Sequence, residues 1–451
     1  MRPSAHRLAA LLALLALPLS AEDSLPLSSD RPDLEQRLVD LKEQANGGDL
    51  HAAQQLYMRY AVAGLTEQAR AWAARYNDLL AQQADSGDTR AMMQLGSRYL
   101  TGGDYTPQSL EKAATWFSRA AEAGAPSAAY VLGEIFARQG NVPMSAQAYE
   151  QAYKLYSKAL QDDPQNPDTL YWLGFMEQNG IGTPRQAEAG IAKLTQAAER
   201  GSAWASAHLF KTYLNGIGTP PNEAKAYDFA RKLADERQDG AMAYIVATAY
   251  LQGNGPEQNE QLGEHYLDIA VRANMPDAIY VKANRLERAD RMADALPLYR
   301  QAASMQQREA LVRMGTLLLQ GAEGVEQDEA RGLSMLNAAG SRFESPQAAW
   351  ELTQYYDRVG ESELSDSWCV AASNRGIASA MARRGLLHLI PGSCVTWSPT
   401  ETYRWWRIGK QAGDSTCALY INLFLHLFTP LLLLLVFGLP AYLSYRANKK
   451  G

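Results

Sequence analysis

A short pattern of small, apolar and aromatic residues recurs along most of the chain. It begins with a small or turn residue, followed by alanine four positions later, leucine or a similar residue at eight, a small residue at nine and an aromatic residue at twelve. The segment 87–99 carries it in full, with Ala91, Leu95, Gly96 and Tyr99. Offsets four, eight, nine and twelve share one face of an α-helix, so each copy predicts an amphipathic helix.

Ten copies of this pattern follow one another at a nearly constant period. Alanine occupies the fourth offset in eight of the ten, and a small side chain there lets a neighbouring helix approach closely. A period of about 36 residues that fills a chain predicts a solenoid rather than separate domains. The residues at the twelfth offset are Tyr60, Tyr99, Phe136, Glu177, Tyr213, Tyr250, Leu286, Leu318, Tyr356 and His388, which lie 32 to 41 residues apart.

A second helix is expected in each copy, often ending in two alanines such as Ala120 and Ala121. The loops between the two helices contain glycine and proline, as in GIGTP at 180–184 and 216–220. Glycine supplies positive φ in such loops, and proline favours the start of the next helix. Each copy is therefore predicted to be a helical hairpin that buries its apolar face by stacking on its neighbours.

These hairpins resemble the Sel1-like repeat. The resemblance is carried by GAEGVEQDEA at 321–330, by the pattern AxxxLGxxY and by the paired alanines, while residues 149–174 resemble the related tetratricopeptide repeat. It covers residues 47 to about 414, although several copies lack the central glycine, and it implies an all-α, right-handed α-solenoid of about ten hairpins. Proteins of this type act as adaptor surfaces, so we expect a protein or peptide partner on the solenoid.

The two ends of the chain differ from the repeats. Residues 1–21 resemble a signal peptide, with basic residues before an apolar run at 8–19 and a small residue, Ala21, at the expected cleavage position. An uncleaved anchor is the alternative. Residues 22–46 are expected to hold an N-terminal capping helix, because Leu34, Leu38 and Leu41 share one helical face.

Residues 418–443 contain no charged side chain. A helix of 26 residues is about 39 Å long, which exceeds the ~30 Å hydrocarbon core of a bilayer. We therefore expect a single transmembrane helix, with the basic tail 444–451 in the cytoplasm by the positive-inside rule. Asn422 and His426 lie four residues apart on that helix, either contacting another transmembrane helix or reaching the outer interface. The same position near the bilayer would let Trp397, Trp405 and Trp406 touch lipid headgroups, or else pack within the last repeat.

The composition of the chain excludes several classes of function. Apolar residues make up 47% of the 451 residues and charged residues 20%, which excludes a disordered chain and a transporter with many spans. The net charge of −6 gives no basic surface for nucleic acid. The six histidines are scattered, the GIGTP loops recur at the repeat period as turns do, and no nucleophile motif is present. We expect a non-catalytic protein without a metal or cofactor.

The cysteines Cys369, Cys394 and Cys417 all lie near the C-terminus. Thiols outside the cytoplasm tend to pair, so a Cys369–Cys394 disulfide is one expectation and three buried thiols the other. The resulting hypothesis is a scaffold anchored in the inner membrane with its solenoid in the periplasm. The family resemblance implies a role in assembling envelope, secretion or exopolysaccharide-export machinery, and contact with a polysaccharide is left open. The alternative is a lumenal adaptor in protein quality control, although the chain has no Asn-x-Ser/Thr acceptor for glycosylation.

Overall fold

The structure is a computed structural model that describes residues 32–103, 105–255, 257–322, 324–390 and 393–428. Helices occupy almost all of this part of the chain, and its only β pairing is a single bridge between Ala322 and Val325. The fold is therefore an all-α repeat solenoid, as the sequence predicts. It divides into two compact units, residues 1–233 and 234–451.

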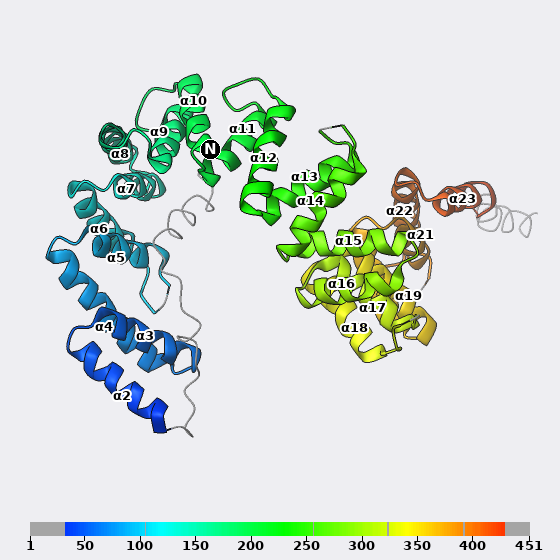
Figure 1. Ribbon diagram of the computed structural model, residues 1–451. Helices are drawn as coiled ribbons and strands as arrows, with labels where there is room; N and C mark the ends of the chain where they lie inside the picture. The colour runs from blue at the N-terminus through cyan, green and yellow to red at the C-terminus, as the bar shows by residue number, and fades with distance from the viewer. Residues whose placement is uncertain (1–31, 104, 256, 323, 391–392, 429–451) are drawn as a thin grey trace, which may run out of the picture. The chain divides into compact units, whose positions relative to one another are not determined.

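Unit 1 begins with a single helix and continues in antiparallel pairs, which Figure 1 shows lying side by side. The division between the units falls inside α12 (Glu223–Arg237). The helices before it are α2 (Pro32–Asn46), α3 (Leu50–Val62), α4 (Thr66–Asp85), α5 (Thr89–Thr101), α6 (Leu110–Glu122), α7 (Pro126–Arg138), α8 (Val142–Asp162), α9 (Pro167–Asn179), α10 (Ala187–Glu199) and α11 (Ala203–Asn215).

Unit 2 repeats the arrangement and ends in a further helix. Its helices are α13 (Gly240–Gln252), α14 (Glu260–Arg272), α15 (Pro276–Arg288), α16 (Met292–Ser304), α17 (Arg308–Gln320), α18 (Glu329–Asn337) with the π-helical turn η2 (Ala338–Arg342), α19 (Pro346–Val359), α20 (Ser362–Asn374), α21 (Ala378–Leu387), α22 (Pro399–Gln411) and α23 (Ser415–Leu423), which continues as η3 (Phe424–Phe428). The described residues thus form ten successive pairs, α3/α4 to α21/α22, and the prediction of about ten hairpins is confirmed.

Polar caps fix where the first helix of many pairs begins. Asp49, Asp88, Asn166, Ser202 and Asp239 precede α3, α5, α9, α11 and α13, and the side chain of each accepts a backbone N–H bond from the first turn. Such caps satisfy amide groups that have no partner within the helix. In these five copies the residue after the one that opens the pattern caps the helix, and it therefore places the apolar face in the same register from one pair to the next.

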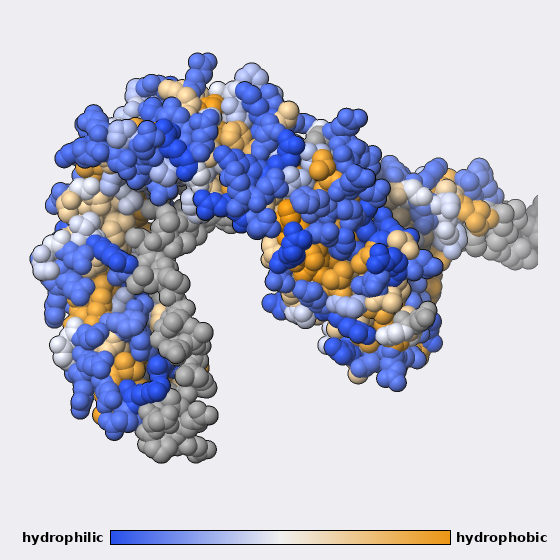
Figure 2. Space-filling view, in the orientation of Figure 1, coloured by the Kyte–Doolittle hydropathy of each residue, from blue (hydrophilic) through white to orange (hydrophobic). Residues whose placement is uncertain are grey.

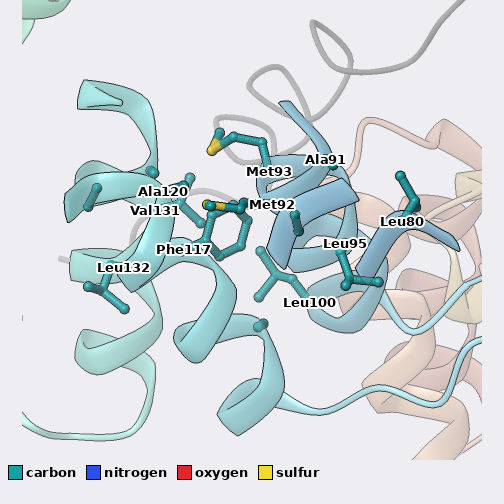
Figure 3. Packing of buried hydrophobic residues seen from close by; sticks show 14 of the residues in the cluster. Leu80, Ala91, Met92, Met93, Leu95, Leu100, Phe117, Ala120, Val131 and Leu132 are labelled. Atoms are coloured by element: carbon teal, nitrogen blue, oxygen red, sulfur yellow. The ribbon is translucent and has the colours of Figure 1, made fainter. Parts of the chain in front are cut away.

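The core of unit 1 is built from the small and large residues of that pattern. Ala91 and Leu95 of α5 are buried, as is Phe117 of α6. Figure 3 shows Phe117 of α6 lying among apolar side chains of α5 and α7, the helices that precede and follow α6 in the chain. A Cβ atom at Gly96 would lie 3.0 Å from the Phe117 ring, so the glycine makes room for it. The aromatic ring fills the space that the small residues leave.

Two glycines bring the backbones of α9 and α10 unusually close. A Cβ atom at Gly174 would lie 2.7 Å from the carbonyl oxygen of Gly190, and one at Gly190 would lie 2.5 Å from the carbonyl oxygen of Gly174. The GIGTP loop joining these helices is a turn, with Gly180 and Gly182 at φ 69° and 66°. The interpretation of these loops as repeat turns is therefore confirmed.

The last helix before residue 428, α23, packs on the last pair of unit 2. Its buried residues Cys417 and Ile421 pack against Trp406 of α22, whose indole N–H donates to the carbonyl oxygen of Ala382 at 3.0 Å. Trp405 stacks instead on the guanidinium of Arg384, 4.0 Å from the ring centre. The start of the apolar segment 418–443 is thus part of the last repeat.

Most of the predicted terminal segments cannot be compared with this structure. The signal peptide 1–21, residues 429–443 of the expected transmembrane helix and the tail 444–451 lie outside the described residues. Across the helices that the structure does describe, none combines the length and apolar character needed to cross a bilayer. Membrane anchorage therefore stays a prediction, as do the right-handed winding of the solenoid and the domain boundaries.

Candidate binding groove

The first helices of three consecutive pairs in unit 2 line a shared hollow. A cavity of about 320 Å³ lies over α15, α17 and α19, and we call it the α15–α19 groove. Asp277, Glu309 and Gln347 each occupy the second position of their helix and lie along these helix starts. The polar and aromatic side chains that line the groove are Tyr280, Glu309, Arg313, Thr316, Gln347 and Glu351.

Local capping places these side chains. The side-chain oxygen of Gln307 accepts from the N–H of Ala310 at 2.6 Å, and the hydroxyl of Ser345 accepts from the N–H of Ala348 at 3.2 Å. Both caps start a helix at the corresponding point of its repeat. The hollow is lined by position five of α15, by positions two, five, six and nine of α17, and by positions two and six of α19. The groove is therefore a consequence of the repeat rather than of one local motif.

A second hollow of about 400 Å³ adjoins the same helix starts. It is lined by Asp277 and Gln307 and shares Arg308 and Glu309 with the α15–α19 groove. The side-chain amide of Gln307 donates to Asp277 at 3.2 Å and to Glu309 at 2.5 Å, so it links two carboxylates from neighbouring repeats. The two hollows thus form one continuous polar surface along α15, α17 and α19.

Ion pairs hold the carboxylates of this surface in their charged form. Burial alone would raise the pKa of Glu309, but hydrogen bonds from Arg308 and Gln307 outweigh it and the pKa lies below its usual value. Burial likewise opposes ionisation of Glu287, yet Arg313 and Tyr299 lower its pKa, and the Tyr299 hydroxyl donates to it at 2.6 Å. The groove therefore presents fixed charges: Glu309 is held at the start of its own helix, and Arg313 is paired with Glu287 of α15.

The charge of Glu309 also affects the pKa values of Tyr244 and Tyr280. Burial raises the pKa of Tyr280, and the negative charges of Glu309 and Glu287 raise it further. Burial raises the pKa of Tyr244 too, with smaller contributions from Asp277 and Glu309. Both tyrosines are therefore neutral donors at physiological pH. A surface of neutral hydroxyls, amides and paired charges suits hydrogen bonding to an extended peptide better than nucleophilic chemistry.

A larger hollow of about 650 Å³ lies elsewhere in unit 2. Met314, Leu318 and Met335 form its apolar side, and Arg300 and Arg331 stand at its polar side. It lies between α16, α17 and α18, and its wall includes the loop after α17. The side chains that line this hollow come from two neighbouring pairs, whereas those of the α15–α19 groove come from three. The groove is therefore the stronger candidate for a binding surface in a repeat protein.

The two cysteines predicted to pair are free thiols in the structure. Cys369 is buried on α20, and its thiol donates to the carbonyl oxygen of Ala380 at 3.5 Å. Burial raises the pKa of Cys369 to about 12. Cys394 is exposed in the connection between α21 and α22, and burial also raises its pKa. The disulfide stays a prediction.

Asn422 and His426 are both exposed. They lie on α23 and η3, away from the buried face formed by Cys417 and Ile421. A transmembrane contact through them stays a prediction. No cluster of three or more side chains suited to a metal ion occurs within the part of the chain that the structure describes.

Sequence reasoning missed the groove residues. The pattern that reveals the repeat is apolar, whereas the groove is formed mostly by polar residues at other positions of the first helices. Aligning Asp277, Glu309 and Gln347 at the second helical position would have placed them on one surface. The copies vary too much in sequence for that alignment to stand out before the helix starts are known.

Comparison with known families identifies the repeats. Six segments match the Sel1 repeat, at residues 89–124, 167–202, 205–237, 241–275, 308–342 and 378–414. Residues 133–179 match the tetratricopeptide repeat, in the region where the sequence resembles that unit. No curated protein matches the chain.

One solved structure supports the same fold. The chain is similar to c5321, a protective antigen of uropathogenic Escherichia coli with an SLR fold, at 24% identity and a TM-score of 0.55, over 86% of this chain and 82% of that protein. It is also similar to a Sel1 repeat protein from Oxalobacter formigenes, at 22% identity and a TM-score of 0.33, over 91% of this chain and 99% of the other. At such identities the first similarity establishes the fold alone, and the second adds no argument.

Proposed function

From the premise that this chain belongs to the Sel1-like and tetratricopeptide-like repeat proteins, we propose that it is a non-catalytic, membrane-anchored scaffold that holds a protein partner in its α15–α19 groove. Repeats of this family generally bind protein partners, and the family is generally non-catalytic. The partner we propose is a component of an envelope, secretion or exopolysaccharide-export complex. The solenoid lies on the periplasmic side, and the C-terminal tail is cytoplasmic.

The observation that carries this proposal is the continuity of the groove over three repeats. Its side chains come from α15, α17 and α19, and Glu309 and Gln347 occupy the same position of their helices. Arg308, Gln307 and Ser345 order its rim through hydrogen bonds. An ordered surface of this kind binds at a lower entropic cost than flexible side chains would. An extended segment laid across three helices contacts one pocket after another, so affinity accumulates over the repeats.

Removing the α19 side of the groove tests this function. Gln347 is exposed and donates to Glu351 at 2.9 Å, so the double variant Gln347→Ala, Glu351→Ala truncates the groove wall without opening the core. Gln354→Ala with Arg358→Ala is the matched control, because both residues are exposed on the same helix and neither lines the groove. Co-purification from mild detergent should lose the partner only with the groove variant. Equal recovery from both variants would contradict the proposed site.

The proposed membrane topology has a separate test. A phosphatase reporter that is active only outside the cytoplasm should be active when fused near Gly413 and inactive when fused after Gly451. The opposite pattern would reverse the orientation, and activity at both sites would exclude the membrane span. Neither result would bear on the groove, so binding and anchorage can fail independently.

A further inference from the structure

The last repeat of unit 2 leaves large apolar side chains in solvent. Trp397, in the connection before α22, is 62% exposed, and Leu419 and Leu423 of α23 are 55% and 38% exposed. Figure 2 shows hydrophobic surface on the segment labelled α23 in Figure 1. Single exposed apolar residues are ordinary, but three large ones within the segment 397–423 favour an interaction surface.

The packing of α23 does not account for this exposure. The helix uses Cys417 and Ile421, one turn apart, to contact Trp406. Leu419 and Leu423 are also one turn apart and point to the other side, since residues four apart share a face. The fold therefore needs only one face of α23. Its second apolar face remains free for a partner outside the repeat.

The helix on which α23 packs, α22, carries exposed basic side chains. Arg407 and Lys410 are exposed on α22, and neither forms an ion pair within the described residues. Arg404 on the same helix is paired with Glu401 at 3.2 Å. Asp414 is engaged as the cap of α23, where it accepts from the N–H of Cys417 at 2.8 Å. The terminal hairpin thus offers apolar groups together with two unpaired positive charges.

We propose that Trp397, Leu419, Leu423, Arg407 and Lys410 form a collar that rests on an anionic lipid bilayer. Tryptophan and leucine enter the interfacial zone, and the two cations lie at the phosphate headgroups. The chain itself supports lipid as the occupant, because residues 429–443, which follow η3 directly, contain no charged side chain. The proposal rests on the proposed membrane anchorage and adds to it a second, peripheral contact that fixes the orientation of the last repeat against the bilayer.

Lipid quenching of tryptophan fluorescence tests the collar in the full chain. The protein is reconstituted into phosphatidylcholine vesicles, with or without phosphatidylglycerol, in which the acyl chains are brominated or unmodified. Brominated lipid should quench part of the emission of the wild-type protein, and Trp397→Phe should lose most of that quenched component. Trp204→Phe is the matched control, since Trp204 is 46% exposed in unit 1 and should leave the quenched component unchanged.

The charges provide an independent arm of the test. A basic side chain near an anionic surface contributes about 1 kcal/mol, so Arg407→Gln with Lys410→Gln should weaken contact with phosphatidylglycerol vesicles roughly thirtyfold. The quenched component should then fall to its value in neutral vesicles. Lys158→Gln with Lys211→Gln, two exposed residues of unit 1, should have no such effect.

The outcomes separate the collar from the anchor. A carbonate wash that strips the protein from vesicles would overturn the anchorage and the collar together. Retention with equal quenching of wild type and Trp397→Phe would overturn the collar alone. A Trp397 emission that shifts with protein concentration instead of with lipid would assign the face to a second protein, which would also contradict the proposal.

Discussion

Replacement of Gly174 by alanine tests whether close approach of the two helices in a pair stabilises the solenoid. The new Cβ atom would lie 2.7 Å from the carbonyl oxygen of Gly190 and 2.9 Å from the amide nitrogen of Leu194. Both are backbone atoms, so no side-chain rotation relieves the overlap. Ordinary Cβ contacts begin near 3.4 Å, so α9 and α10 must separate by about 0.7 Å.

This separation has a cost that exceeds the gain in helix propensity. Overpacking a well-packed site typically costs about 1–3 kcal/mol, and rigid backbone contacts favour the upper part of that range. Alanine is about 1 kcal/mol better than glycine inside a helix. The net loss of stability should therefore be about 1–2 kcal/mol, which corresponds to a decrease of roughly 2–8 °C in the melting temperature of a unit of this size.

The matched control is Gly96→Ala on α5. Its Cβ atom would lie 3.0 Å from the Phe117 ring. The Phe117 side chain can shift to relieve this contact, whereas the backbone atoms near Gly174 cannot. The gain in helix propensity should nearly cancel the contact, leaving the melting temperature close to that of the wild type. Thermal unfolding followed by circular dichroism measures both variants in mild detergent. A Gly174→Ala protein as stable as the wild type or the control would refute the argument from helix approach.

Three further predictions concern unit 2. Glu287→Gln should remove a pH dependence of stability, because the pKa of Glu287 in the folded protein lies below 4.5. The pair with Arg313 therefore stabilises the unit fully above pH 4.5, and this stabilisation is lost as the pH falls through the folded pKa. In urea unfolding, the stabilities of variant and wild type should differ at neutral pH and converge in acid. Trp406→Ala should destabilise α21–α23 by about 3–5 kcal/mol. Hydrogen exchange should become faster in α21–α23 and stay unchanged in α15–α19. Unchanged slow exchange in α21–α23 would contradict the packing described for Trp406. Protein prepared without reductant should yield a peptide pair linked through Cys369 and Cys394 in mass spectrometry, whereas alkylation of both thiols before reduction would exclude the disulfide.

The repeat could be predicted from sequence because its signals are local. Asp88 or Ser202 caps a helix whatever lies elsewhere in the chain, and the apolar offsets define one face of that helix. Copies that depart from the pattern still fold as hairpins, because other contacts replace the central glycine. Phe210 packs edge-on against Tyr227 of α12, and the carbonyl oxygen of Thr353 accepts from the hydroxyl of Ser365 on α20 at 3.0 Å.

The groove and the end of the solenoid depend on packing that sequence patterns do not reveal. Glu309 and Gln347 lie 38 residues apart and become neighbours only when α17 and α19 stack in register. Ile421 belongs to an uncharged run that is typical of a membrane span, yet it packs on Trp406. An apolar run has the same composition whether it faces a protein or a lipid. The burial of Ile421 is therefore evident only from the structure.

Site-specific photo-crosslinking in cells tests the central claim, that the α15–α19 groove holds a protein partner, most directly. A benzoylphenylalanine placed at Gln347 lies in the groove, and one at Gln354 lies on the same helix outside it. The proposed function predicts a discrete crosslinked protein from position 347 and none from position 354. Crosslinks from both positions, or from neither, would contradict it.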